Sequence, residues 1–104
     1  MNLSPVEAIN RVNESVTVEM LVLRTKCCSG SRQVFLDSEA NHRDPNNLGV
    51  VVTEAGRAKF SEAGIDDPTA HFHGKTIRVR GVVIRKENRP YIEVTDPSQI
   101  EMAT

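Results

Sequence analysis

The sequence predicts a small all-β domain in which five strands close into a Greek-key barrel, accompanied by short helices. Three observations lead to this prediction. Apolar and polar residues alternate along the longest predicted strands, as expected when one face of a strand is buried. Helix-forming and helix-capping residues separate the third predicted strand from the fourth. The length of 104 residues fits one ordinary domain.

The chain is expected to begin with a short helix. Ser4 is a suitable N-cap, Pro5 suits the first helical position and Glu7 completes a capping box. The apolar residues that follow recur at helical spacing. The expected organisation is therefore an N-terminal helix at 1–14, a barrel at 15–100 and a tail at 101–104.

The first three strands are predicted at residues 15–24, 33–37 and 49–53. In the first, apolar and polar residues alternate, but Leu21 and Leu23 interrupt the pattern. A bulge, or cover from the N-terminal helix, would explain apolar residues on both faces. The third strand is a short β-branched run, which indicates burial. The polar segment between the second and third strands is predicted to be a long loop.

The second half of the chain adds a helix and two strands. The helix is predicted to start after Thr53 and to end near Gly64. The fourth strand, at residues 75–86, has the strongest pattern, and Gly81 within it predicts a bulge or tight bend. The fifth strand is predicted at residues 91–95.

Two segments then show a family resemblance. H-F-H-G-K-T-I-R-V-R-G-V-V (71–83) is similar to the glycine-lysine entry to the fourth strand of small bacterial OB-fold domains, and R-P-Y-I-E-V-T-D-P-S-Q-I (89–100) is similar to their fifth strand and closing segment. The chain thus resembles the anticodon-binding-like group of nucleic-acid-binding OB folds. The resemblance implies a barrel that binds ligands on the face of its second and third strands and on the adjoining loops.

Basic residues gather at the two loops that contact ligands in such a barrel. A cation near a phosphate releases counterions on binding, which makes the binding salt-dependent. Phe35 and Tyr91 share the parity of polar neighbours and are candidates to stack on bases. For Phe35 the alternative of packing under the 38–47 loop is favoured, because a lone phenylalanine is more often a core residue. The candidate nucleic-acid-binding residues are Arg24, Lys26, Arg32, Phe35, Lys86, Arg89 and Tyr91.

Two functions follow from these observations. The first is a non-catalytic module that weakly binds single-stranded DNA or RNA through the loops joining strands one to two and four to five. The second is a protein-interaction or accessory domain, whose partner would be another protein or a second copy of this chain at an open sheet edge. The net charge of −1 and the scarcity of aromatic residues, with three Phe, one Tyr and no Trp, favour the second.

Enzymatic and metal-binding motifs do not stand out in the sequence. It has no G-x-S-x-G, no phosphate-cradling glycine loop and no H-E-x-x-H, so we expect neither catalysis nor a cofactor. Cys27 and Cys28 are adjacent and are interpreted as loop thiols. His71 and His73 would share one side of a strand, but no further ligand completes a metal site, and a structural pair is favoured.

The sequence also gives an expectation for location. No apolar run approaches the ~20 residues that cross a bilayer, and the N-terminal residues lack the regions of a signal peptide. We therefore expect no membrane partner, and a cytoplasmic location if this is the full chain. The alternative is a piece of a longer precursor.

Overall fold

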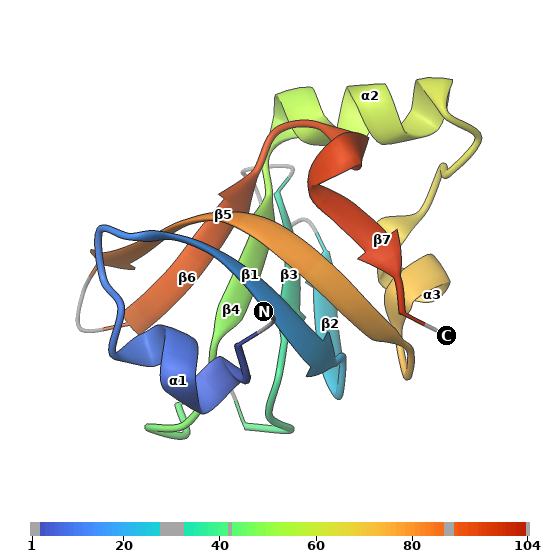
Figure 1. Cartoon of the computed structure of the whole chain (residues 1–104). Helices are drawn as coiled ribbons and strands as arrows, with labels where there is room; N and C mark the ends of the chain where they lie inside the picture. The colour runs from blue at the N-terminus through green and yellow to red at the C-terminus, as the bar shows by residue number, and fades with distance from the viewer. Residues whose placement is uncertain (1–2, 28–32, 42, 87–88, 104) are drawn as a thin grey trace.

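The computed structural model describes residues 3–27, 33–41, 43–86 and 89–103. Within these residues the chain forms seven strands and three short helices (Figure 1). None of the helices in the described ranges has the length and apolar character needed to cross a membrane. The strands are β1 (Ser15–Leu21), β2 (Arg24–Cys27), β3 (Val34–Asp37), β4 (Gly49–Val52), β5 (Thr76–Lys86), β6 (Arg89–Val94) and β7 (Ile100–Met102); the helices are α1 (Pro5–Ile9), α2 (Glu54–Glu62) and α3 (Pro68–Phe72), with a 3-10 turn η1 (Pro97–Gln99).

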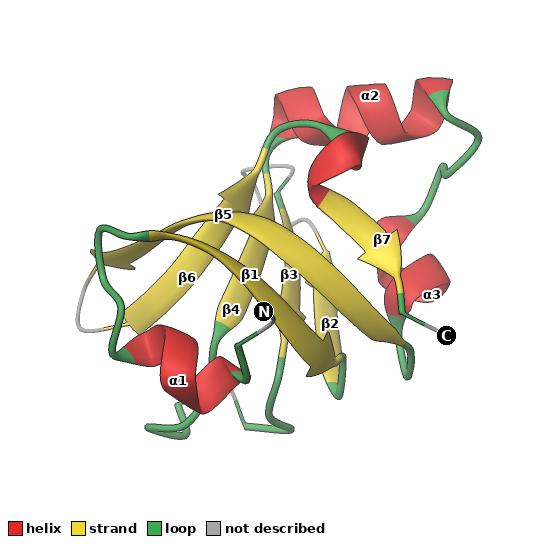
Figure 2. Cartoon of the chain, viewed as in Figure 1, coloured by secondary structure: helices red, strands yellow, loops and turns green. Residues whose placement is uncertain are grey.

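The strands form one strongly curled sheet (Figure 2). Their order is β1-β5-β6-β4-β3-β2, and β7 pairs with β5 beside this path. The pairs are antiparallel except for β4 and β6, which run parallel. Residues 76–82 of β5 pair with β1, and residues 83–86 pair with β6. The prediction of a mainly β barrel with short helices is therefore confirmed.

The described chain has seven strands where five were predicted. Only Val22 and Leu23 separate β1 from β2. The N–H of Val22 donates to the Lys75 carbonyl at 2.9 Å, whereas the N–H of Leu23 donates to the Asp37 carbonyl at 3.0 Å. The chain thus changes partner from the β5 side to β3 at this point. The additional strand β7 reaches Met102 and includes residues that were assigned to the tail.

The N-terminal helix does not cover Leu21 and Leu23, so this part of the prediction is wrong. The two side chains are 45% and 44% exposed. The buried side chains of this segment are Val18, Met20 and Val22, which keep the same parity through the break between the strands. The two leucines therefore continue the alternation on the outer face.

Two predicted helices have the expected caps. The Ser4 hydroxyl accepts from the N–H of Glu7 at 3.2 Å, while the Glu7 carboxylate accepts from the N–H of Ser4 at 3.0 Å. The Thr53 hydroxyl accepts from the N–H of Gly56 at 3.1 Å and caps α2. Beyond α2, Gly64 has a φ of +91°, a backbone conformation that favours glycine.

The sequence did not predict α3. Asp67 caps it by accepting from the N–H of Thr69 at 3.1 Å, and Pro68 occupies its first turn. The side-chain hydrogen bond from Thr69 is the largest effect that lowers the pKa of Asp67. His71 lies in this helix and His73 at its C-cap, both exposed. They do not share one side of a strand, so that premise of the metal hypothesis is wrong.

The core lies inside the barrel and under the helices. It consists mainly of valine, isoleucine and leucine from the strands, together with Phe60 of α2 and Phe72 of α3. The two phenylalanine rings pack edge to face, with their centroids 5.8 Å apart. In β5 the inward parity runs unbroken through Gly81, so the predicted bulge is absent from this strand. A Cβ at position 81 would lie 2.6 Å from Ile92 Cγ2, which explains why this position is occupied by glycine.

Replacing Gly56 by alanine is expected to destabilise the protein, although alanine is the better helix former by about 1 kcal/mol. The new Cβ would lie 2.6 Å from the Val94 carbonyl oxygen, so α2 would have to move off the sheet. Overpacking of this kind costs about 1–3 kcal/mol. Urea unfolding measures the change, and the exposed position Ala55→Gly is the control for helix propensity alone. A more stable Gly56→Ala protein would contradict this packing.

Candidate nucleic-acid interface

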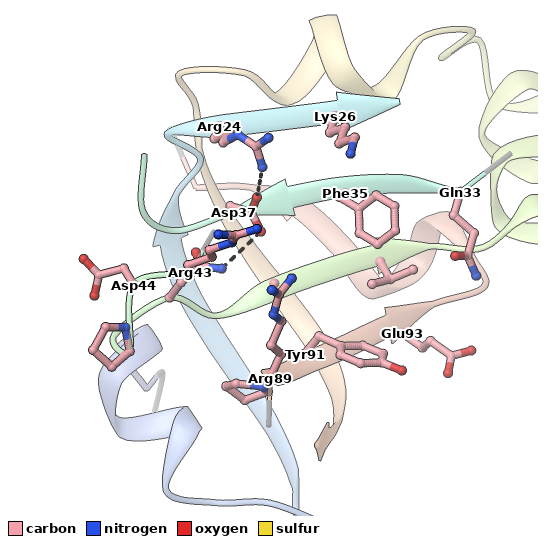
Figure 3. A pocket seen from close by; sticks show the side chains of 15 residues that line it. Arg24, Lys26, Gln33, Phe35, Asp37, Arg43, Asp44, Arg89, Tyr91 and Glu93 are labelled. Carbon is pink, nitrogen blue, oxygen red and sulfur yellow. Dashed lines mark hydrogen bonds and ion pairs between the residues drawn. The ribbon is translucent and has the colours of Figure 1, made fainter. Parts of the chain in front are cut away.

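An open groove of about 900 Å³ crosses the outer face of β2, β3, β4 and β6 (Figure 3). Because successive side chains of a strand point to opposite faces, strand register decides which residues line it. One outward row runs Lys26, Phe35, Val51 and Glu93 across the four strands. The next outward row runs Arg24, Asp37, Gly49 and Tyr91.

One half of the groove is aromatic. Phe35 is half-buried on β3, and its neighbours Val34 and Leu36 are fully buried. Phe35 is not part of the core cluster and its ring lines the groove, so the favoured interpretation of Phe35 as a core residue under the 38–47 loop is wrong. Stacking on a base stays a prediction for this residue. Val51 lies on β4 beside Phe35 and is 6% exposed. Tyr91 on β6 borders the groove on the far side of β4 (Figure 3).

The other half of the groove is rich in arginine. Arg24 forms an ion pair with Asp37 at 3.2 Å, and the Asp37 carboxylate also accepts from the side-chain amide of Asn47 at 3.2 Å. Arg43 reaches the groove from the loop after β3, and Arg89 reaches it from the start of β6 (Figure 3).

The charges of the groove differ from those of the whole chain. Four basic side chains and three carboxylates line it, against a net charge of −1 for the protein. The carboxylate of Asp37 is already paired with Arg24. Within the described part of the chain, Lys26, Arg43 and Arg89 form no ion pair. The groove therefore presents three cations to a ligand next to an aromatic surface.

The structure brings together five of the seven residues predicted from the sequence. Arg32 lies outside the described residues, as do the loop residues 28–32 and 87–88. Lys86 ends β5, where its backbone pairs with Arg89. The predicted residues that line the groove are Arg24, Lys26, Phe35, Arg89 and Tyr91.

The positions of the basic residues correct one expectation. Arg24 and Lys26 lie on β2 and Arg89 is the first residue of β6, so they line the sheet rather than the loops. Cys27 is the last residue of β2, and Cys28 lies outside the described residues.

Sequence reasoning missed several groove residues. Arg43 lies in a polar segment that was predicted only as a loop, and no local pattern shows that this loop reaches the sheet. The alternation of β3 could have indicated Asp37, because it shares the parity of Phe35. The other missed residues include Gln33, Asn47, Val51 and Glu93.

Solved structures contain regions of the same shape. Asparaginyl-tRNA synthetase from Pyrococcus horikoshii, complexed with asparaginyl-adenylate, matches 100% of the chain with a TM-score of 0.65 and 14% identity. Aspartyl-tRNA synthetase from Entamoeba histolytica matches 95% with a TM-score of 0.62 and 15% identity. The barrel is OB-like. This agrees with the resemblance seen in the sequence, and the identities limit the likeness to the fold.

The OB-like barrel corresponds to only a part of these enzymes. The chain covers 22% of the P. horikoshii synthetase and 20% of the E. histolytica synthetase. No protein-family model matches the sequence. No curated protein sequence matches it either.

Proposed function

We propose that the chain is a non-catalytic module that binds single-stranded nucleic acid in the groove over β2, β3, β4 and β6. The observation that supports this most directly is the convergence of two aromatic rings and three unpaired cations on one open surface among the described residues. Single-strand-binding surfaces combine a basic track for the backbone with aromatic rings for the bases.

In this proposal the bases face the sheet. Phe35 and Tyr91 each offer a ring on which a base can stack, worth about 1–3 kcal/mol per base. Phosphates pass near Lys26, Arg43 and Arg89, and each contact releases counterions. Glu93 and Asp44 repel phosphate from the groove, which keeps the binding weak. The synthetases of similar fold act on tRNA, as their names state, which supports RNA as one ligand class.

The barrel is proposed to be a five-stranded Greek-key OB fold with one strand divided. β1 and β2 then represent two halves of a single bent strand, because they are consecutive and pair with β5 and β3 on either side of the break. The helices α2 and α3 lie between β4 and β5 in the chain, which matches the helix between the third and fourth strands of that fold.

The proposal is tested by fluorescence anisotropy with labelled oligo(dT) and oligo(U) of about 12 nucleotides, a length within the site size of OB folds. We expect dissociation constants of about 1–100 µM at low salt, weakening as salt rises. No binding of either probe at low salt, with protein well above about 100 µM, would refute the proposal.

Replacing Phe35 by alanine is expected to weaken oligonucleotide binding about 5- to 150-fold, because one stacking platform of about 1–3 kcal/mol is lost. The same titration measures the change, and the salt dependence should stay as in the wild type because no charge is removed. Leu21→Ala is the matched control, since Leu21 is exposed on β1 outside the groove. Wild-type affinity in a folded Phe35→Ala protein would show that Phe35 does not contact bases.

A second candidate function is that of a protein-interaction domain. Leu21 and Leu23 expose apolar side chains where β1 passes into β2, and neither lines the groove. Light scattering after size-exclusion chromatography distinguishes the two functions. A mass above that of one chain, unchanged by added oligonucleotide and reduced by Leu21→Ser and Leu23→Ser together, would favour this second function.

A further inference from the structure

A buried polar network lies beside the groove. Asp37 and Asn47 are the two polar residues that are buried among those described. The Asn47 amide donates to one carboxylate oxygen of Asp37 at 3.2 Å, and its carbonyl oxygen accepts from the N–H of Glu39 at 3.0 Å. Satisfied buried polar networks favour a single arrangement of the chain around them. Asn47 therefore fixes the loop after β3 to the sheet.

The same network continues into a tight turn at residues 43–48. The Asp44 carbonyl accepts from the N–H of Asn47 at 2.9 Å, and the Asp44 carboxylate accepts from the N–H of Asn46 at 2.8 Å. The Ser38 hydroxyl accepts from the N–H of Leu48 at 2.9 Å and forms a second attachment to the end of β3. Arg43 is the first residue of this segment, and its side chain extends over the groove near Asp37 (Figure 3).

We propose that Asn47 and Asp37 are positioning residues, which hold the 43–48 turn against β3 so that the Arg43 guanidinium stands where a phosphate crosses the groove. This inference rests on the proposed function and adds a determinant of affinity that acts by orienting Arg43 rather than by supplying a charge to the phosphate. An exposed arginine on a loose loop loses conformational entropy when it binds, and that cost offsets much of its attraction to phosphate. The hydrogen bonds of Asn47 and Asp37 already order the turn that carries Arg43 in the free protein, so less conformational entropy is lost on binding.

A double-mutant cycle tests the inference with the same labelled oligo(U). Arg43→Ala should lower the slope of log affinity against log salt by about 0.7, the value for one phosphate on a single strand. Asn47→Ala should lower it by a similar amount, although it removes no charge. The double variant should bind no more weakly than Arg43→Ala alone, because the two residues act through one contact. Asn46→Ala, on the same turn, should bind as the wild type does.

A merely structural role for Asn47 predicts a different result. If Asn47→Ala leaves the salt slope unchanged, or if the losses of affinity multiply in the double variant, the positioning role is wrong. Should Asn47→Ala fail to fold, Ser38→Ala is the second variant. It removes the attachment to Leu48 and the long hydrogen bond that the Ser38 hydroxyl donates to the Asn47 side-chain oxygen at 3.5 Å, and it keeps the contact between Asn47 and Asp37. It should reduce the salt slope in the same direction.

A readout without nucleic acid separates this inference from the proposed function. The ¹⁵N heteronuclear NOE of Arg43 Nε reports the order of the guanidinium in the free protein. It should fall in Asn47→Ala and stay unchanged in Asn46→Ala. If the wild type binds neither oligonucleotide but the NOE falls as expected, the proposed function fails and the positioning of Arg43 stands. An unchanged NOE in a folded Asn47→Ala protein overturns the positioning role whatever the protein binds.

Discussion

Replacing Lys26, Arg43 and Arg89 together by alanine is expected to weaken oligonucleotide binding on the order of 10- to 100-fold at low salt and to lower the salt slope by about two. These are the cations of the groove that form no ion pair within the described residues. Three lost phosphate contacts, at about 0.7 per contact on a single strand, give that slope. Anisotropy titrations at several salt concentrations measure both quantities.

The matched control removes three positive charges elsewhere. Arg11, Lys59 and Arg80 are exposed and do not line the groove, so their joint replacement by alanine changes net charge equally. If binding depends on the groove, this control should retain nearly the wild-type salt slope. Equal losses in the two triple variants would show that attraction is a property of total charge, and the groove would lose its assigned role.

Replacing Asp37 by alanine is expected to destabilise the protein by about 2–4 kcal/mol, since breaking a buried charged pair leaves its partners unsatisfied. The Asp37 side chain is 7% exposed, whereas that of Arg24 is 32% exposed. Most of the cost therefore falls on the buried Asn47 amide, because Arg24 can turn to solvent. Urea unfolding followed by circular dichroism measures the change.

Asp37→Asn separates the charge of this residue from its shape. Its side-chain oxygen can still accept from Asn47, so the loss of stability should be about 1 kcal/mol, that of one net hydrogen bond. Oligonucleotide binding should tighten, because a negative charge leaves the groove and Arg24 is released. If Asp37→Ala and Asp37→Asn are both as stable as the wild type, the network contributes nothing to the fold.

Local signals in the sequence predicted elements that are stabilised locally. The caps at Ser4 and Thr53 predicted α1 and α2 because a cap needs only neighbouring residues. The five residues of α3 are too few to show helical periodicity, and the N-cap Asp67 alone does not predict a helix. The break between β1 and β2 depends on a change of partner from β5 to β3, which no local pattern contains.

The residues of the candidate site also fall into those that local sequence signals indicate and those that depend on distant contacts. Strand parity made Phe35 and Tyr91 candidates for the outward face, although the sequence favoured packing under the 38–47 loop for Phe35. Proximity to strand ends indicated Arg24, Lys26 and Arg89. Arg43 could not be found by either signal. Its place over the groove depends on the contact between Asn47 and Asp37, ten residues apart in the chain.

The parallel pairing of β4 with β6 has a consequence for how the protein is synthesised. Gly49 pairs with Tyr91 in that register, so the ribosome must release more than forty further residues before β4 finds its second neighbour. Until then β4 and the end of β5 present unpaired backbone, the kind of edge that recruits strands from other nascent chains. Closure through such distant contacts is slow compared with helix formation. The growing polypeptide therefore acquires its groove only when β6 has emerged and paired with β4.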